Sequence, residues 1–176
     1  MASISITQAT TSADVASIAE CFRAYTEWLG LDLTFQNFAK ELENLPGAYT
    51  PPSGALLLAR DSGTGEVLGC IGLRPLQLQQ EYKARNPGGV RYCEVKRLFV
   101  YPAARGRRVA RALVGEALKV AEAEGYGEAL LDTLATMKPA IALYESEGFI
   151  ETEPYYLNPL DGVVYMSKKL GGQGLK

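Results

Sequence analysis

The residues best suited to chemistry in this sequence are four closely spaced arginines: Arg105, Arg107, Arg108 and Arg111. A guanidinium group matches the geometry of a phosphate, so this density of arginines indicates a ligand that carries phosphate. Gly106 lies within the run, and a helical pattern begins directly after it. The first N–H groups of a helix have no intrahelical partner and the helix dipole favours negative charge there, so this turn is a natural anion site. Glu94, upstream on the preceding apolar stretch, is a candidate base. The combination suggests an enzyme that uses a cofactor.

The arginine run and Glu94 could each have a purely structural role instead of a functional one. The arginines could form a solvated helix start, but the helix dipole disfavours cations at that end, so an anionic ligand accounts for the run better. Glu94 could instead pair with Lys96, which lies two residues further along and on the same face of a strand. The residues alone leave both roles of Glu94 open.

The composition indicates a single domain over residues 1–176, with a mobile tail at Gly171–Lys176. The apolar fraction of 47% is enough for a core. There is no run of about 18 apolar residues, so we expect no transmembrane span and no membrane partner. There is no basic segment followed by an apolar one, so we expect no signal peptide. The net charge of −2 argues against a nucleic-acid partner. Positive charge is concentrated between Arg91 and Arg111, which suggests a bounded anionic ligand.

The three cysteines, Cys21, Cys70 and Cys93, are odd in number and show no metal-binding spacing. We therefore expect buried thiols in a reducing compartment, a cytoplasmic protein and no metal. The chain contains no histidine. Histidine-based triads and histidine-ligated zinc are therefore excluded, and acid–base chemistry falls to Glu, Asp, Tyr, Cys or Lys.

The elements that must position these residues form a mixed pattern. Alternating and β-branched residues predict strands at Ser3–Ala9, Gly54–Arg60, Val67–Leu76, Val90–Tyr101, Glu128–Leu134, Phe149–Glu153 and Val163–Leu170. Apolar residues at offsets of three and four predict helices at Ser12–Leu29 with Ser12 as N-cap, at Phe35–Leu45, from the arginine run to Gly125, and at Lys138–Glu147. Gln77–Gly89 is predicted to be a loop or a short helix. This order predicts a mixed α/β or α+β sheet with helices on its faces.

Three segments in this order resemble the GNAT superfamily of N-acetyltransferases. They are KRLFVYPAARGRRVARALV (Lys96–Val114), AIALYESEGF (Ala140–Phe149), and the pair PYYLNP (Pro154–Pro159) and VVYMSKKL (Val163–Leu170). The resemblance implies the GNAT fold. That fold has a mostly antiparallel central sheet of six to seven strands, a splayed central strand pair and about four flanking helices. It also implies acetyl-CoA as donor, CoA as product, an amine as acceptor and direct attack of the amine on the thioester.

The resemblance assigns roles to particular residues. The backbone N–H and C=O groups of Leu98, Phe99 and Val100 would contact the pantetheine arm. The pyrophosphate would bind N–H groups of the turn and helix start, at Arg105, Gly106, Arg107, Arg108, Val109, Ala110 and Arg111. Tyr144 matches a tyrosine that acts as general acid for the leaving thiolate, and Glu94 lies at a spacing where members carry a base. The alternative for Tyr144 is a core aromatic on an amphipathic helix.

Two positions depart from the family pattern. The family usually has glycine where Arg108 stands, and glycine lets a backbone approach phosphates closely. An arginine can keep a helical backbone there, with its side chain either clamping the phosphates or pointing away. Many members have asparagine at the position of Met137, and Lys138 is a candidate to compensate by contacting phosphate.

The acceptor site is predicted between the first helices, the loop before the central strand and the closing hairpin. Its candidate residues are Tyr25, Trp28, Tyr82, Tyr155, Tyr156 and Asn158. Such aromatics suit a flat or apolar amine and could hold a cation, although packing beneath loops is an equal alternative for each. We expect a small-molecule or amino-acid-like amine. A protein or peptide acceptor, a non-catalytic acyl-CoA-binding module and a homodimer stay open.

Overall fold

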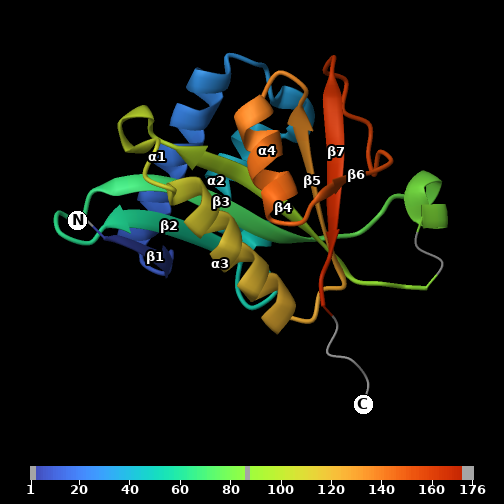
Figure 1. The fold of residues 1–176 in the computed structure, drawn as a ribbon, viewed down its shortest axis with the longest axis horizontal. Coiled ribbons are helices and arrows are strands. Elements are labelled where there is room, and N and C mark those ends of the chain that lie inside the picture. Colours follow the sequence, from blue (N-terminus) through green and yellow to red (C-terminus); the bar gives the residue numbers. More distant parts are fainter. Residues whose placement is uncertain (1–2, 86–87, 172–176) are drawn as a thin grey trace.

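The structure is a computed structural model that describes residues 3–85 and 88–171. Its centre is a seven-stranded sheet in the order β1-β2-β3-β4-β5-β7-β6 (Figure 1). The strands are β1 (Ile4–Gln8), β2 (Ala55–Asp61), β3 (Val67–Leu76), β4 (Tyr92–Val100), β5 (Glu128–Leu134), β6 (Ile150–Glu151) and β7 (Val163–Lys169). Neighbouring strands are antiparallel except β4 and β5, which are parallel. The predicted fold class is confirmed.

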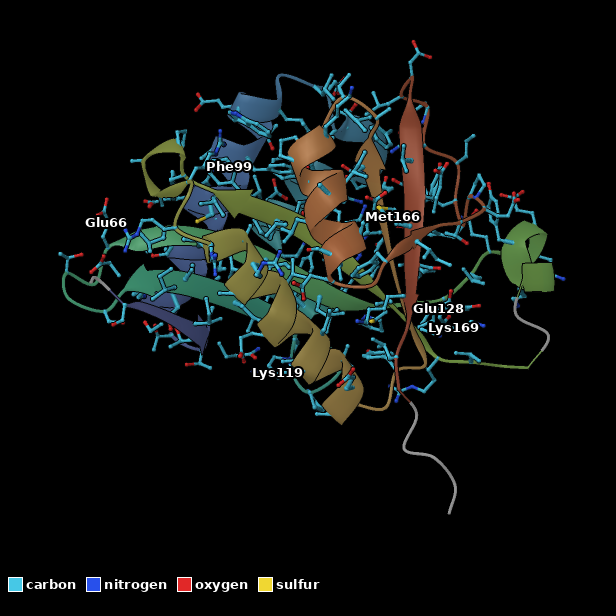
Figure 2. All side chains as sticks on the ribbon, in the orientation of Figure 1. Glu66, Phe99, Lys119, Glu128, Met166 and Lys169 are labelled. Carbon is cyan, nitrogen blue, oxygen red and sulfur yellow. The ribbon has the colours of Figure 1, made fainter. Side chains whose placement is uncertain are left out.

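In the described part of the chain, four α-helices cover the two faces of this sheet (Figure 1). They are α1 (Ser12–Leu29), α2 (Phe38–Glu43), α3 (Val109–Ala123) and α4 (Lys138–Ser146). One core cluster joins α3 and α4 to β2, β3 and β5, while a second joins α1 and α2 to the opposite face. Figure 2 shows Lys119 on the outer side of α3, away from the sheet. No helix among the described residues has the length and apolar character needed to cross a bilayer.

The predicted N-cap of α1 is wrong by one residue. Thr11, and not Ser12, caps the helix, because its Oγ1 accepts the N–H of Asp14 at 3.1 Å. Asp14 in turn accepts the backbone N–H of Thr11 at 3.3 Å, which completes a capping box. Gly30, in the left-handed conformation with φ 66°, ends the helix as predicted.

The predicted helix over Phe35–Leu45 is not continuous. A 3₁₀ turn at Thr34–Gln36 is followed by α2, and Asn37 between them has φ 55°. A left-handed residue cannot continue a right-handed helix, so the chain changes direction there. The strand predicted at Phe149–Glu153 shrinks to β6, because the N–H of Phe149 still bonds to Tyr144 O at the end of α4. Residues 172–176 of the predicted mobile tail lie outside the described residues.

Strand β4 contains a bulge at Arg97 and Leu98, which together face Ile71 of β3. Arg97 has φ 58°, an unusual value for a residue that is not glycine. Just past the bulge, Gly69 pairs with Val100 and permits close contact, because a Cβ there would lie 2.3 Å from Phe99 O. A bulge bends its strand and redirects side chains, and this one precedes the segment predicted to hold the cofactor.

Strands β4 and β5 pair over only three positions, Tyr92–Glu94 with Glu128–Leu130. Beyond Glu94 the two strands diverge, and the described backbone of Val95–Val100 has no strand partner on its β5 side. The predicted splayed strand pair is therefore confirmed. The opening between the strands is where the candidate site lies.

Candidate functional site

An apolar groove of about 630 Å³ runs between the diverging strands. This volume is in the range typical of ligand sites. Residues from β4, α4 and the end of α1 line it, among them Trp28, Leu98, Phe99, Val100, Met137 and Leu143. The three β4 residues predicted to contact a pantetheine arm therefore lie together in one groove.

The backbone of β4 also faces this groove. The N–H of Tyr101 bonds to Leu68 O on β3. N–H directions alternate along a regular strand, so the N–H group of Val100 points to the opposite, open side. Arg105 Nε donates to Val100 O at 3.2 Å, and its guanidinium lies 4.7 Å from the ring centre of Trp28. The groove thus offers both apolar side chains and a backbone donor.

The turn before α3 provides further backbone donors. Gly106 has φ 82°, and Arg108 is the N-cap of α3 with φ 62° and ψ 23°. Arg108 therefore does not keep the helical backbone expected of it and instead adopts the left-handed conformation that favours glycine. Ala112 makes the first intrahelical bond, to Arg108 O at 3.1 Å, so the N–H groups of Val109–Arg111 belong to the free first turn. This arrangement fits a pyrophosphate.

The arginine side chains largely contact other protein groups. Arg107 pairs with Asp61 at 2.8 Å and holds the pKa of that carboxyl below its usual value. Arg111 pairs with Glu147 at 2.9 Å. Arg108 is exposed, as is Lys138 in the first turn of α4. The side-chain roles of the arginine run and of Lys138 toward phosphate stay predictions.

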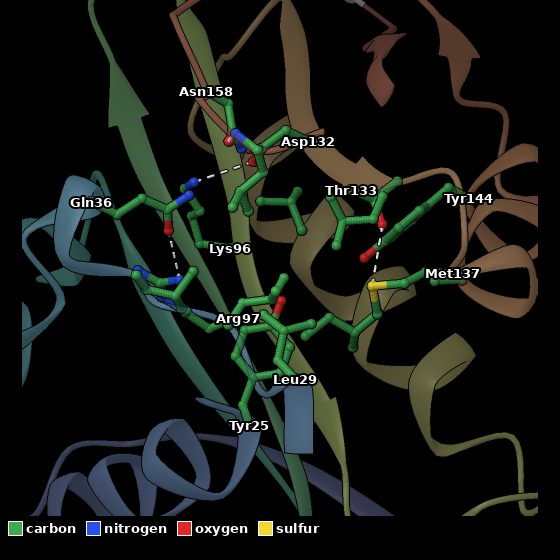
Figure 3. Close-up of a pocket in the computed structure, with 17 residues that line it drawn as sticks. Tyr25, Leu29, Gln36, Lys96, Arg97, Asp132, Thr133, Met137, Tyr144 and Asn158 are labelled. Carbon is green, nitrogen blue, oxygen red and sulfur yellow. Dashed lines mark hydrogen bonds and ion pairs between the residues drawn. The ribbon is translucent and has the colours of Figure 1, made fainter. Parts of the chain in front are cut away.

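The groove adjoins a smaller polar pocket of about 90 Å³ (Figure 3). The two share lining residues, including Leu98, Leu134 and Met137. The polar side chains of the pocket are Tyr25, Gln36, Lys96, Arg97, Asp132, Thr133, Tyr144 and Asn158. Two predicted acceptor residues, Tyr25 and Asn158, are therefore brought together with the predicted acid.

Tyr144 lies on α4 and is 7% exposed. Its ring packs edge-on against Phe149, with centroids 5.7 Å apart. Burial raises the pKa of its hydroxyl above the ordinary value of tyrosine. The hydroxyl consequently stays protonated at neutral pH and can donate a proton or a hydrogen bond.

Asp132, on β5, was not identified from the sequence and is the only carboxylate lining the pocket among the described residues. Its Oδ1 lies 3.3 Å from Lys96 Nζ, and its Oδ2 accepts Asn158 Nδ2 at 2.8 Å and the Tyr156 hydroxyl. Burial alone would raise the pKa of this carboxyl, but Lys96 and the hydrogen bonds hold the pKa below its usual value. The available signal was Asp132 itself, an acidic residue that directly follows the apolar residues Ala129–Leu131 of β5.

Glu94 lies outside the linings of both the groove and the pocket. Its carboxylate is 2% exposed and contacts Arg74 at 2.8 Å, the Tyr155 hydroxyl at 2.6 Å and Lys96 at 3.5 Å. The pairing of Glu94 with Lys96, predicted as the alternative to a catalytic role, is therefore present. Arg74 and Tyr155 lie closer to the carboxylate than Lys96 does. The role of Glu94 as a base stays a prediction.

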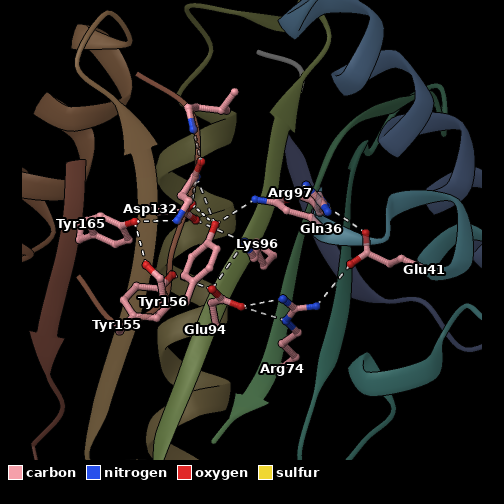
Figure 4. Close-up of polar contacts among 12 residues, drawn as sticks. Gln36, Glu41, Arg74, Glu94, Lys96, Arg97, Asp132, Tyr155, Tyr156 and Tyr165 are labelled. Atoms are coloured by element: carbon pink, nitrogen blue, oxygen red, sulfur yellow. Dashed lines mark hydrogen bonds and ion pairs between the residues drawn. The ribbon is translucent and has the colours of Figure 1, made fainter. Parts of the chain in front are cut away.

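Glu94 belongs to a closed polar ring that joins β3, β4 and β5 to the helical segment around α2 and to the segment between β6 and β7 (Figure 4). In order, its members are Arg74, Glu94, Lys96, Asp132, Tyr156, Gln36, Arg97 and Glu41, which returns to Arg74. Three acidic and three basic side chains balance in charge, which allows them to be buried together. The ring fixes the polar wall of the pocket.

The other predicted acceptor residues lie elsewhere. Trp28 is 48% exposed and lines the groove. Tyr155 is buried behind the pocket, Tyr156 supports Asp132, and Tyr82 packs in the cluster with Leu78. Within the described residues, no group of three or more His, Cys, Asp or Glu side chains is arranged to hold a metal ion.

The sequence and the fold of this chain are similar to those of known proteins. The model of the acetyltransferase (GNAT) family matches residues 16–149. An uncharacterized N-acetyltransferase of Schizosaccharomyces pombe is 42% identical over 163 residues, with 93% of each chain covered. A GNAT acetyltransferase of Staphylococcus aureus has a TM-score of 0.71 at 19% identity, covering 96% of this chain and 100% of its own. The yncA protein of Salmonella typhimurium, solved with its cofactor acetyl-CoA, has a TM-score of 0.67 at 17% identity. The match covers 99% of this chain and 98% of the yncA chain. The two structures show likeness of fold.

Proposed function

The chain belongs to the GNAT family of acetyltransferases, and from this premise we propose that it transfers an acetyl group from acetyl-CoA to the primary amine of a small molecule. One observation carries the proposal. The apolar groove, which suits an acyl-donor arm, adjoins a polar pocket that Tyr144 lines. Donor and acceptor would therefore meet beside a buried proton donor.

The groove would hold the donor. The backbone groups of Leu98, Phe99 and Val100 would contact the pantetheine arm, and the free N–H groups at the start of α3 would bind the pyrophosphate. When bound, acetyl-CoA supplies an acetyl thioester. The N–H of Leu98 would donate to the thioester oxygen as negative charge develops on it.

The polar pocket would hold the acceptor. A primary amine is mostly protonated at neutral pH, so it must lose a proton before or during attack. The amine nitrogen then forms a bond to the acetyl carbon, and the bond from that carbon to sulfur breaks. Tyr144 would donate its proton to the departing thiolate. Because thiols have a pKa near ~8.5, this donation should help only moderately.

We retain Glu94 as the proposed proton acceptor. Lys96 lies between Glu94 and the pocket, at 3.5 Å from the Glu94 carboxylate. A proton from the acceptor would therefore reach Glu94 through Lys96 or through a water molecule. Arg74 and Tyr155 hold the carboxylate in position for this transfer.

The test is thiol release from acetyl-CoA in the presence of primary amines. The panel comprises alkylamines, amino acids, amino sugars, polyamines and peptides with free N-termini or lysines. We expect turnover with at least one small amine, and acetylated product by mass spectrometry. Acetylation of peptides alone would replace the small-molecule proposal with a peptide acceptor. CoA binding without turnover of any amine would contradict it altogether.

A further inference from the structure

The polar pocket carries an excess of positive charge. Lys96 and Arg97 both line it, whereas Asp132 is the only carboxylate of its described lining. The acids that balance the two cations, Glu94 and Glu41, lie behind them in the polar ring and outside the lining. A molecule in the pocket therefore meets two cationic groups and one anionic group.

These cationic groups retain donors for a ligand. An ammonium group has three N–H donors, and Lys96 Nζ has two carboxylate partners at 3.3 and 3.5 Å. A guanidinium has five, and Arg97 directs Nε to Glu41 at 2.9 Å and Nη1 to Gln36 at 2.8 Å. Both side chains are about 5% exposed or less, so any charge they bind is shielded from water.

Asp132 also has an open position. Its Oδ2 accepts from Tyr156 and Asn158, which occupies both lone pairs of that oxygen. Its Oδ1 accepts from Lys96 alone among the described residues. Oδ1 can therefore accept one further N–H, and an amine in the pocket is the natural donor.

The backbone supports a dedicated role for Arg97. It adopts φ 58° inside the β4 bulge, a left-handed conformation that is strained for a residue with a side chain. Such strain persists where the surrounding structure holds it, often at ligand sites. Here Glu41, Gln36 and the ring of Phe38, 5.1 Å away, hold the guanidinium at the pocket wall.

We propose that the acceptor is a small amine that also carries a carboxylate, as an amino acid does. Its carboxylate binds Lys96 and Arg97, and its amino group donates to Asp132. This inference rests on the proposed function and specifies its substrate class. The pocket of about 90 Å³ has room for about three water molecules, which suits the amino and carboxylate groups of such a ligand while its side chain extends outward.

Charge explains why this acceptor suits the reaction. The lining carries one net positive charge, and an amino acid carries one negative charge once its amine has lost a proton. The pocket therefore favours the form with a nucleophilic amine. A polyamine or an alkylammonium ion would instead add positive charge beside Lys96 and Arg97, which is unfavourable in a buried site.

The experiment compares each of the twenty proteinogenic amino acids with its own amide, which keeps the amine and removes the carboxylate charge. Thiol release from acetyl-CoA gives kcat/KM for each. We expect at least one amino acid to exceed its amide by 100-fold or more, because a site built to bind a group discriminates strongly against its loss. Equal or faster acetylation of amides, alkylamines or polyamines overturns the inference while leaving the proposed function intact. Absence of turnover with every amine contradicts both.

Variants of Lys96 and Asp132 test their proposed contacts with the acceptor. Lys96→Gln should raise KM for the preferred amino acid at least tenfold and abolish its advantage over the amide, with KM for acetyl-CoA unchanged. Lys119→Gln, on the exposed side of α3, is the matched control. If Lys96→Gln does not fold, Lys96→Gln combined with Asp132→Asn removes both charges of the pair and should show the same loss of preference. An unchanged preference in the folded variant overturns the assignment.

Discussion

Arg97 Nε donates to Glu41 Oε2 at 2.9 Å, and this buried ion pair joins the bulge of β4 to the short helix α2. Glu41 also accepts the Tyr49 hydroxyl at 2.7 Å and faces Arg74 at 3.5 Å. A segment of only six helical residues is thereby attached to the strand that forms the site. The pocket wall consequently depends on a contact between residues 56 positions apart.

Replacing Glu41 by Gln should destabilise the protein by about 3–5 kcal/mol, because the buried guanidinium of Arg97 would lose its charged partner. Urea unfolding followed by circular dichroism measures the change. Glu116→Gln removes an exposed partner of Lys119 and should cost less than about 1 kcal/mol. A similar small loss in both variants would show that the ion pair contributes little.

Replacing Arg108 by Gly should stabilise the protein by about 1 kcal/mol, because φ 62° is strained for arginine and free for glycine. Gly106→Ala is the reverse control and should destabilise the protein. Open space surrounds Gly106, so its φ of 82° is the one feature that makes a side chain unfavourable there. We expect the affinity for CoA, measured by calorimetry, to stay within twofold in Arg108→Gly. A tenfold weaker affinity would instead mean that the Arg108 side chain clamps the phosphates.

Replacing Tyr144 by Phe should lower kcat about tenfold and leave KM for acetyl-CoA unchanged, because the hydroxyl acts on the leaving thiolate. Burial raises the pKa of this hydroxyl, so its proton is retained and kcat should not fall between pH 7 and pH 9 through loss of it. Tyr126→Phe, remote from groove and pocket, is the matched control. Unchanged kcat in Tyr144→Phe would return Tyr144 to the role of a core aromatic.

Replacing Glu94 by Gln tests the base. A carboxylate can accept the proton and an amide cannot, so the variant should lose at least tenfold in kcat. KM for acetyl-CoA should stay normal. Unchanged activity across pH would remove Glu94 from that role. Lower stability of the variant with an unaltered pH profile of kcat would indicate that Glu94 only positions Lys96.

Acid should weaken the fold partly through Asp132. Its pKa is lower in the folded protein than in the unfolded chain, so the unfolded chain binds the proton more tightly. The stabilisation is therefore present above the unfolded pKa of about 4 and is lost as pH falls toward the folded pKa. Unfolding free energies at pH 7 and pH 3 should differ less in Asp132→Asn than in the original protein. An equal difference would show that Asp132 contributes nothing to acid sensitivity.

Local patterns were enough for most of the fold. The apolar offsets of α3, the left-handed glycines after the helices and the strand that ends before Pro102 are short-range features, and the structure has them where they were predicted. Errors occurred where a single residue decided the outcome. Asn37 interrupts the second predicted helix because its backbone is left-handed. The helical pattern of apolar residues does not reveal the backbone conformation of a single residue.

The sequence by itself determined the family, the fold class and the segments that would hold the donor, because those features lie in continuous stretches around Arg105 and Tyr144. Only the tertiary structure decided the acceptor pocket. Asp132 and Lys96 lie 36 positions apart and meet because β4 and β5 are parallel neighbours that then diverge. Glu94 shows the converse, since a residue predicted to face the reaction is buried behind Lys96 by Arg74 and Tyr155. Which side chain reaches a pocket depends on bulge, register and long-range pairing, and these follow from contacts that no local pattern encodes.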